Sequence, residues 1–205
     1  TTINRWHTCG NSGRINASNP CSEFMFVDDS ACNLASLNLA RFVDEAGRFD
    51  VARFQHACRL LIIAQDLIVD NASYPSIEIA RNSHRFRPLG LGYANLGSLL
   101  MRSGLAYDSD GARAYAASVT ALMSGTACLA SREIAEIKGP FEGYAENAEC
   151  MRGVLRMHRE AAESLESLNS PVHIRRAAQK AWKEVETVPD DKGFRNSQVT
   201  LLAPT

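Results

Sequence analysis

The chain has 205 residues, a formal net charge of −1 and a hydrophobic fraction of 45%. A charge this close to zero lacks the basic footprint of a nucleic-acid-binding protein, and no apolar run is long enough to span a bilayer. Six cysteines in 205 residues are too few for a dense disulfide scaffold, and they contain no Cys-x-x-Cys spacing, which argues against a zinc site. We therefore expect a cytoplasmic globular protein with reduced thiols, no bound metal, and no nucleic-acid or membrane partner.

The first informative stretch is Asn19-Pro-Cys-Ser-Glu23. Alternate side chains of an extended backbone share one face. The amide of Asn19, the thiol of Cys21 and the carboxylate of Glu23 are therefore predicted to point the same way. Pro20 stiffens the backbone between them, so one short segment presents three different functional groups together.

These groups suit hydrogen-atom chemistry better than nucleophilic chemistry. A nucleophilic cysteine needs a neighbouring histidine to form a thiolate, and the nearest histidine in the sequence is His7. A neighbouring carboxylate disfavours a thiolate by like-charge repulsion, so Glu23 favours a neutral S–H at Cys21. In such a site Glu23 is a candidate general base for a substrate hydroxyl, and Asn19 is a candidate hydrogen-bond partner of that substrate.

A chain reversal is predicted directly after this segment. Residues 24–27 read as a short buried strand, and Asp28-Asp-Ser30 is a turn signal. The reversal carries a second thiol, Cys32, back towards the first. Alternating apolar residues then predict a strand over residues 34–43.

A helix is predicted from Asp50, a residue type that caps helix N-termini, and its apolar periodicity ends near Asn71. Residues 76–83 predict one or two helical turns. We interpret the basic residues in and after this stretch as a solvated charged face; they are Arg81, Arg85 and Arg87.

The pattern Gly90-x-Gly92 resembles a dinucleotide-binding fingerprint only superficially, because Asn95 stands where the third glycine belongs. We instead predict a helix over about residues 91–103 whose glycines let it approach a neighbouring element closely. Gly104 is expected to close that helix.

The rest of the chain predicts three helices and a final strand. Ligands in α/β folds bind beyond the carboxyl ends of strands, so Pro204 and Thr205 open a candidate binding loop. The expected elements are a helix capped within 108–110 and running to about 137, one over about 148–165 capped by Asn147, one over about 171–185 capped by Ser170, and a buried strand over 196–203.

Several blocks of the chain, in order, resemble the large catalytic chain of ribonucleotide reductase, in particular its adenosylcobalamin-dependent (class II) type. The likeness covers essentially the whole chain, and its specificity comes from the order of the blocks. The blocks are Trp6-His-Thr-Cys9, Gly13-Arg-Ile-Asn-Ala-Ser18, Asn19-Pro-Cys-Ser-Glu23, Ala31-Cys-Asn-Leu-Ala-Ser-Leu-Asn-Leu39, Leu89-Gly-Leu-Gly-Tyr-Ala-Asn-Leu-Gly97, Gly139-Pro-Phe-Glu-Gly-Tyr-Ala145, Arg195-Asn-Ser-Gln-Val-Thr200 and Ala203-Pro-Thr205.

The resemblance implies a helix-rich α/β fold that is part of a ten-stranded α/β barrel, with Cys21 at the tip of a loop inserted into the barrel. The chain is then expected to be an internal fragment of one catalytic barrel domain. Within it, 1–45 would hold the active-site loop and flanking strands, 50–185 mainly helices, and 195–205 a strand that leads into a truncated phosphate-binding loop.

The resemblance also implies a role for each residue of the site. Cys21 would be the thiyl-radical cysteine that abstracts the ribose 3′ hydrogen, Glu23 would deprotonate the 3′ hydroxyl, and Asn19 would hydrogen-bond the substrate. Cys32 would be one half of the redox pair that reduces the 2′ carbon and becomes a disulfide. The implied substrate-binding residues are Asn19, Pro20, Cys21, Ser22, Glu23, Pro204 and Thr205.

By resemblance, the full-length protein reduces ribonucleoside diphosphates to 2′-deoxyribonucleoside diphosphates for DNA synthesis. The implied cofactor is adenosylcobalamin, the implied reductant is a thioredoxin-like dithiol, and a homodimer is the expected form of the full-length chain. Two alternatives stay open: a class I large subunit that takes its radical from a separate subunit, and a truncated homologue that acts only as a non-catalytic binding or assembly module. The sequence does not identify the cobalamin contacts or the second redox cysteine.

Overall fold

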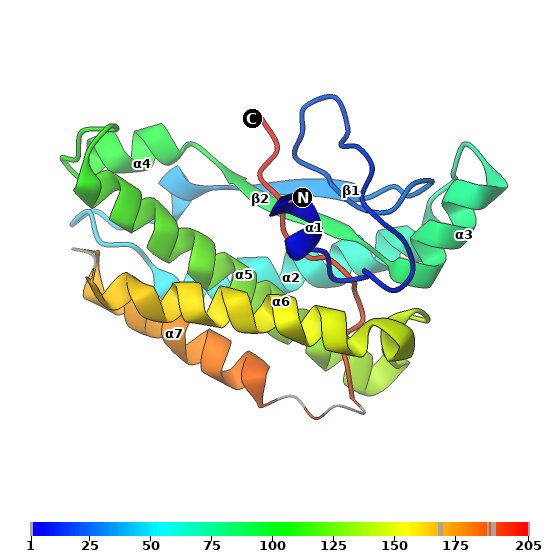
Figure 1. Cartoon of the computed structure of the whole chain (residues 1–205). Coiled ribbons are helices and arrows are strands. Elements are labelled where there is room, and N and C mark those ends of the chain that lie inside the picture. The colour runs from blue at the N-terminus through cyan, green and yellow to red at the C-terminus, as the bar shows by residue number, and fades with distance from the viewer. Residues whose placement is uncertain (1, 168–169, 188, 190–191, 205) are drawn as a thin grey trace.

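A small parallel sheet with helices packed on one of its faces organises the chain (Figure 1). The computed structural model describes residues 2–167, 170–187, 189 and 192–204. In chain order the elements are α1 (Thr2–Arg5), β1 (Asn33–Asn38), the 3-10 helix η1 (Leu39–Phe42), α2 (Val51–Asn71), α3 (Ile77–Phe86), β2 (Leu89–Ala94), α4 (Leu96–Arg102), α5 (Asp110–Lys138), α6 (Tyr144–Ser164), the 3-10 helix η2 (Leu165–Ser167) and α7 (Val172–Glu186).

Strands β1 and β2 run parallel, in a register that pairs Asn33 with Leu89 and Asn38 with Ala94. Parallel neighbours require a crossover connection, and α2 and α3 supply it. A third extended segment lies on the other side of β2, where the Leu89 N–H donates to the Gln198 carbonyl oxygen at 2.8 Å. This final segment is reached through α4 to α7, so the chain repeats a strand–helix–strand arrangement.

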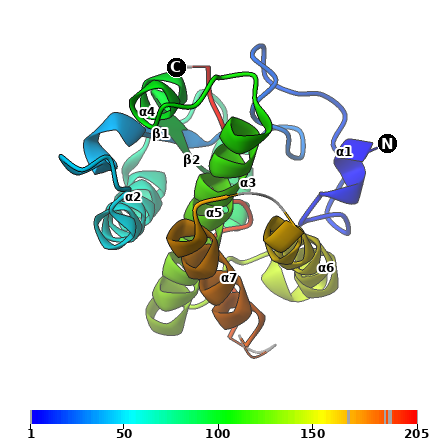
Figure 2. The same ribbon diagram turned by 90° about the vertical axis from the view of Figure 1, so that its left-hand side faces the viewer.

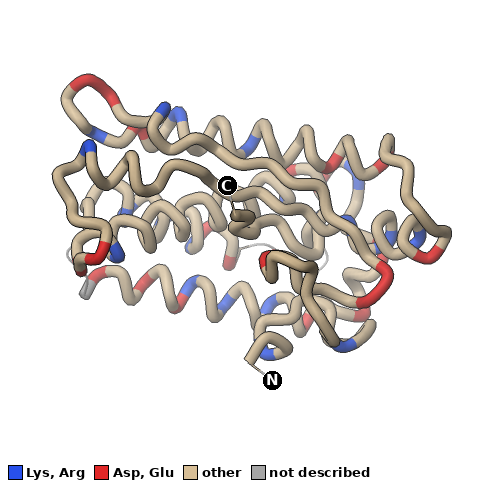
Figure 3. The backbone as a smooth tube through the Cα atoms, turned by 90° about the horizontal axis from the view of Figure 1, so that it is seen from above, with Lys and Arg blue, Asp and Glu red and all other residues tan. Residues whose placement is uncertain are grey.

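The helices bury the apolar face of the sheet. Leu89 and Leu91 of β2 and Leu39 just after β1 have no exposed surface. Helix α5 lies at the centre of the helical layer, with α2, α6 and α7 around it (Figure 2), and small buried residues along its length allow these close contacts. Acidic and basic residues are interspersed along the backbone (Figure 3).

The opposite face of the sheet is partly open. Alternate residues of β1 are exposed there, including Leu34 at 52%, and the C-terminal end lies on this side (Figure 1). A Cβ atom at Gly92 would lie 2.5 Å from the Leu201 carbonyl oxygen. Glycine at this position lets the C-terminal segment cross closely over β2.

Three predicted strands differ from the structure. Residues 24–26 have no assigned secondary structure and Val27 lies in a bend, although Phe26 and Val27 are buried as predicted. The predicted strand over 34–43 ends at Asn38, because the Asn38 side chain accepts a bond from the Ala40 N–H and starts η1. The strand predicted over 196–203 is extended but forms a single parallel bridge, between Thr200 and Leu91.

The helix predicted over 91–103 is wrong in its first part. Residues 89–94 form the buried strand β2, and α4 begins only at Leu96. The prediction that the two glycines allow close approach is confirmed, but for a strand. Gly104 closes α4 with a φ of 68°, as expected.

Helix boundaries predicted from capping residues are mostly confirmed. Asp50 caps α2 and accepts the Arg53 N–H, and Ser109 caps α5. Asn147 is not a cap: α6 begins at Tyr144, and the buried Asn147 side chain instead bonds residues outside the helix. The remaining shifts are small; α3 continues to Phe86, and Pro171 rather than Ser170 precedes α7 as its N-cap.

The interpretation of the arginine cluster as a solvated face is wrong for Arg87. Its guanidinium is buried, and its Nε donates to Asp66 Oδ1 at 2.8 Å. A buried charge is stable only when it is paired, and Arg87 also contacts Asp70 at 2.5 Å. Arg85 pairs with Glu146 at the surface. No helix in the described part of the chain is both long and apolar enough to cross a membrane.

Candidate active site

Cys21 lies at the tip of a tight loop that closes on itself. The Asn19 N–H donates to the Phe24 carbonyl oxygen at 3.2 Å, and the Ser22 N–H donates to the Asn19 carbonyl oxygen at 3.0 Å. Ser22 adopts a φ of 62°, which turns the chain within two residues. The Cys21 thiol is free and its residue is exposed, so it is open to approach from outside.

Asn19 shapes this loop with its own side chain. Its Oδ1 accepts the Phe24 N–H at 3.0 Å. The amide nitrogen takes no part in this bond and is a candidate donor to a bound molecule. The exposed Pro20 and Ser22 flank Cys21 on either side.

Glu23 lies near the second thiol, Cys32. Burial, and in second place the charge of Glu23, raise the pKa of Cys32 to about 12, so this thiol is neutral at pH 7. The Glu23 Oε2 atom is buried and has no hydrogen-bond partner among the described residues. The structure therefore brings an unoccupied acceptor and a protonated thiol into one neighbourhood.

The predicted turn between the two cysteines is confirmed. Asp29 has a φ of 53°, and the Ser30 hydroxyl donates to the Val27 carbonyl oxygen at 2.6 Å. The turn is tied to α3, where Asn82 Nδ2 donates to the Asp28 carbonyl oxygen at 3.1 Å. Cys21 and Cys32 thus belong to one loop whose return is fixed to the helical layer.

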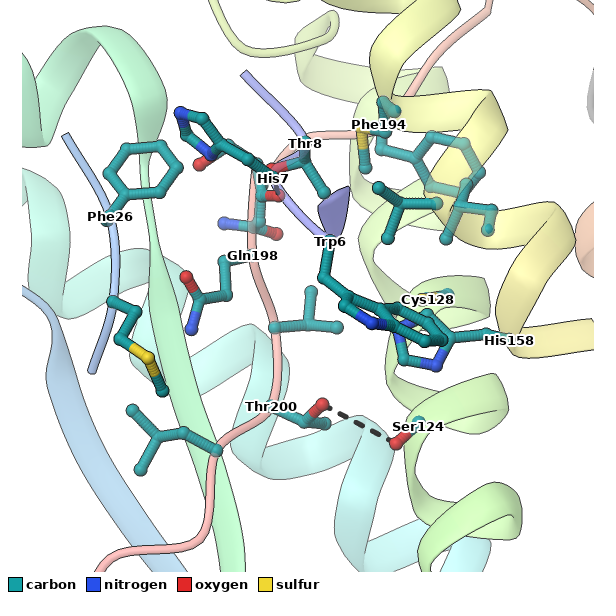
Figure 4. Close-up of a pocket in the computed structure, with 18 of the residues that line it drawn as sticks. Trp6, His7, Thr8, Phe26, Ser124, Cys128, His158, Phe194, Gln198 and Thr200 are labelled. Carbon is teal, nitrogen blue, oxygen red and sulfur yellow. Dashed lines mark hydrogen bonds between the residues drawn. The ribbon is translucent and has the colours of Figure 1, made fainter. Parts of the chain in front are cut away.

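A cavity of about 390 Å³ lies next to this loop, between the N-terminal segment, the 194–201 segment, α5 and α6 (Figure 4). Its surface is mostly apolar, but Glu23 reaches it, whereas Cys21 and Cys32 do not line it. Ser124 and Thr200 approach each other across one wall at 3.4 Å.

Sequence reasoning did not select Gln198 and Thr200 as lining residues of this cavity. Their spacing of two in a predicted strand was the available signal, because alternate residues share a face. His7, which also lines the cavity, bonds the Gly13 carbonyl oxygen at 3.0 Å, and burial lowers its pKa. His7 therefore holds the N-terminal segment in place as a neutral ring.

Of the two residues predicted to open a phosphate-binding loop, Pro204 and Thr205, the structure describes only the first. Pro204 is exposed, near the C-terminal end on the same side of the sheet as the Cys21 loop (Figures 1 and 2). Thr205 lies outside the described residues. The described part of the chain contains no group of three or more His, Cys, Asp or Glu side chains placed to hold a metal ion.

Comparison with known proteins identifies relatives over the whole chain. A family model described as "Ribonucleotide reductase, barrel domain" matches residues 1–205. The chain is 56% identical over its full length to a vitamin B12-dependent ribonucleotide reductase of Rhodopirellula baltica and 47% identical to one of Streptomyces clavuligerus. It is 34% identical, over 71% of its length, to a vitamin B12-dependent ribonucleoside-diphosphate reductase of Mycobacterium tuberculosis. The chain spans about a fifth of the length of each relative.

Proposed function

This chain belongs to the ribonucleotide reductase barrel-domain family, and we propose that it carries the loop on which the full-length protein reduces ribonucleotides. The proposed reaction replaces the ribose 2′ hydroxyl by hydrogen through a thiyl radical. Ribonucleoside diphosphates are the proposed substrates, supported by the name of the Mycobacterium tuberculosis relative.

In the proposed mechanism, Cys21 as a thiyl radical takes the 3′ hydrogen atom of the ribose, and Glu23 accepts the 3′ hydroxyl proton. The 2′ hydroxyl leaves as water with a proton from the pair formed by Cys32 and a second thiol. The pair delivers its other hydrogen to the 2′ carbon and becomes a disulfide, and Glu23 returns its proton to the 3′ oxygen. Cys21 then returns its hydrogen atom to the 3′ carbon. Asn19, Pro20, Ser22 and the Pro204–Thr205 loop are proposed to hold the substrate.

The observation that carries this proposal is that Glu23 lies close enough to Cys32 for its charge to act on the thiol. A general base needs a free acceptor within reach of its proton, and Glu23 Oε2 is buried without a partner among the described residues. A thiol that delivers hydrogen must hold its proton, and burial together with Glu23 keeps the pKa of Cys32 at about 12. Both conditions are met beside a loop whose tip presents an accessible thiol.

We propose adenosylcobalamin as the cofactor of the full-length protein, on the strength of its vitamin B12-dependent relatives. When bound, it supplies a radical equivalent by breaking its cobalt–carbon bond. What the chain offers to a radical source is the exposed Cys21 thiol.

The other proposed partners follow from the reaction. A disulfide formed at Cys32 must be reduced before the next turnover, and a thioredoxin-like dithiol is the proposed reductant. We further propose a homodimer of the full-length chain, a cytoplasmic location, and the division of this chain at residues 1–45, 50–185 and 195–205 into loop, helices and final strand.

The test uses the full-length protein with Cys21→Ser and Glu23→Gln, and Cys150→Ser on α6 as a control outside the site. We expect deoxyribonucleotide formation to fall at least about a thousandfold in Cys21→Ser, with nucleotide binding retained, and to be unchanged in Cys150→Ser. Turnover that survives Cys21→Ser refutes the role proposed for Cys21 and with it the proposed function of this loop. The 205-residue chain alone is expected to be inactive, because it spans about a fifth of its relatives.

A further inference from the structure

Buried side chains from two helices hold the backbone on both sides of Cys32. The Ala31 N–H donates to Ser83 Oγ of α3 at 3.3 Å. On the other side, Gln65 Nε2 of α2 donates to the Asn33 carbonyl oxygen at 3.0 Å, and Asn33 Nδ2 donates back to the Gln65 carbonyl oxygen at 3.0 Å. Ser83 is 1% exposed and Gln65 is 2% exposed, so both contacts belong to the core.

A gain in folding stability does not explain why the amide side chains of Asn33 and Gln65 are buried here. The oxygens Asn33 Oδ1 and Gln65 Oε1 are buried and have no hydrogen-bond partner among the described residues. A buried acceptor without a partner costs more free energy than one neutral hydrogen bond typically contributes. The two amides therefore serve as donors to the backbone while both their oxygens stay unsatisfied.

Pairing within the sheet does not require these contacts either. Asn33 is already in register with Leu89 of β2, and the strand ladder fixes the rest of β1. The additional side-chain bonds concentrate at one point, the residues directly before and after Cys32. They couple the returning end of the loop to α2 and α3, whereas the tip at Cys21 is closed by bonds within the loop itself.

We propose that Gln65 and Ser83 are positioning residues that clamp the backbone around Cys32 and fix its thiol beside Glu23. This inference rests on the redox role of Cys32 in the proposed function. The Cys32 thiol has to reach a bound ribose and afterwards form a disulfide. Its backbone position must therefore be fixed, because a misplacement of about 1 Å can slow a reaction about a hundredfold. Gln65 of α2 and Ser83 of α3 hold the backbone of Cys32 in that position.

The experiment measures the rate at which iodoacetamide alkylates Cys32 and Cys58 in the full-length protein, by mass spectrometry of the two peptides. Cys58 is buried on α2, and burial raises its pKa to about 12, the same as that of Cys32. Global loosening therefore accelerates both cysteines, whereas a loosened clamp accelerates Cys32 alone.

Four variants separate the clamp from general packing. Gln65→Met keeps the side-chain volume but removes the donor, and Ser83→Ala removes the hydroxyl. Ser83→Thr retains the hydroxyl and is the conservative rescue. Gln55→Met is the matched control, since Gln55 lies on the same helix and bonds Thr126 of α5 instead.

We expect Cys32 to react at least about fivefold faster in Gln65→Met and in Ser83→Ala, with Cys58 unchanged and with Ser83→Thr and Gln55→Met near the wild type. Equal acceleration at both cysteines, or none at Cys32, overturns the proposal. If Gln65→Met does not fold, the comparison of Ser83→Ala with Ser83→Thr decides the question.

The same variants keep this inference apart from the proposed function. Alkylation requires no turnover, so an inactive wild type refutes the reductase proposal while the clamp is still measured. In an active wild type, we expect turnover to fall in Gln65→Met with little change in the KM for the nucleotide. A fall confined to KM contradicts a positioning role.

Discussion

The loop over residues 16–32 and the buried cluster around Arg87 are held in opposite ways. The loop is closed by its own backbone turns and by the Asn19 side chain, and its tip residue Cys21 is exposed. In the cluster, Asp66 Oδ1 accepts from both Arg87 Nε and Asn196 Nδ2 at 2.8 Å. Asn196 has no exposed surface and is bonded further to α5 through Ser131.

The loop makes a thiol accessible, whereas the buried cluster stabilises the arrangement of the elements around it. Residues proposed to react with a substrate and a reductant need an approachable thiol, and a loop tip supplies it. The cluster instead joins α2, the start of β2, α5 and the final segment by bonds that leave little freedom. We call the elements joined by the cluster of Asp66, Arg87 and Asn196 the frame. We infer that the frame keeps its shape while the loop carries the reacting groups, and four changes test this division in order of expected effect.

Asp66→Ala is expected to have the largest effect, because it leaves the Arg87 guanidinium buried and deprives it of its most buried partner. Removal of one partner of a buried ion pair costs about 3–5 kcal/mol. Unfolding of the chain in urea measures the change. Asp108→Ala is the control, since Asp108 is 95% exposed in its pair with Arg113; a similar loss in both variants contradicts the role of the cluster as frame.

Gly92→Ala is expected to come second, because the new Cβ would lie 2.5 Å from the Leu201 carbonyl oxygen. The clash involves backbone, and overpacking of this kind costs about 1–3 kcal/mol. Gly97→Ala is the matched control on α4, where nothing lies within 4 Å of the new atom. Thermal unfolding of the two variants should diverge, with Gly97→Ala at or above the wild type.

Asn19→Ala is expected to affect the loop and spare the frame. It removes the bond from the Phe24 N–H to Asn19 Oδ1, and the free energy of global unfolding should fall by less than about 1 kcal/mol. Limited proteolysis should nevertheless cut faster within residues 16–32. The same replacement at Asn71, an exposed residue at the end of α2, should leave the loop intact; a large global loss in Asn19→Ala would show that loop and frame are one unit.

The smallest effect is expected at the exposed rim of the cluster and depends on pH. The hydrogen bond from Arg87 holds the pKa of Asp70 below its usual range. A carboxyl group with a depressed folded pKa stabilises the fold above its unfolded pKa of about 4 and loses that contribution as the pH falls further. Unfolding free energies of wild type and Asp70→Asn should therefore converge below about pH 4, and a difference that stays constant with pH contradicts this.

Local chemistry predicted much of the helical layer and the identity of the loop. The cap at Asp50 and the periodicity after it predicted α2, because capping and helical spacing depend on neighbours in sequence. The ordered blocks around Cys21 pointed to the family that the comparisons confirm, and the helix-rich α/β fold expected of a barrel fragment is confirmed with them. The roles of the individual site residues stay predictions.

Long-range pairing accounts for what the sequence did not predict. Residues 89–94 contain two glycines, which weaken a strand taken alone, and in the structure β1 and the final segment pair with them on either side. Arg87 is buried because Asp66 lies opposite it, although the two are far apart in sequence. Neither the strands that pair with residues 89–94 nor the carboxylate that pairs with Arg87 can be predicted from neighbouring residues in the sequence.

The sequence by itself determined most of the helix caps and the turn at Asp29, since each depends on residues within a few positions. The extended backbone predicted for residues 19–23 is wrong, because the chain turns there, with Ser22 at a φ of 62°. The sequence also predicted the reversal that returns Cys32 towards Cys21, but only the tertiary structure decided that Gln65 of α2 and Ser83 of α3 hold the backbone beside Cys32, where the charge of Glu23 acts on its thiol. Charge acts through space, so the residue that feels it is set by packing and not by spacing along the chain.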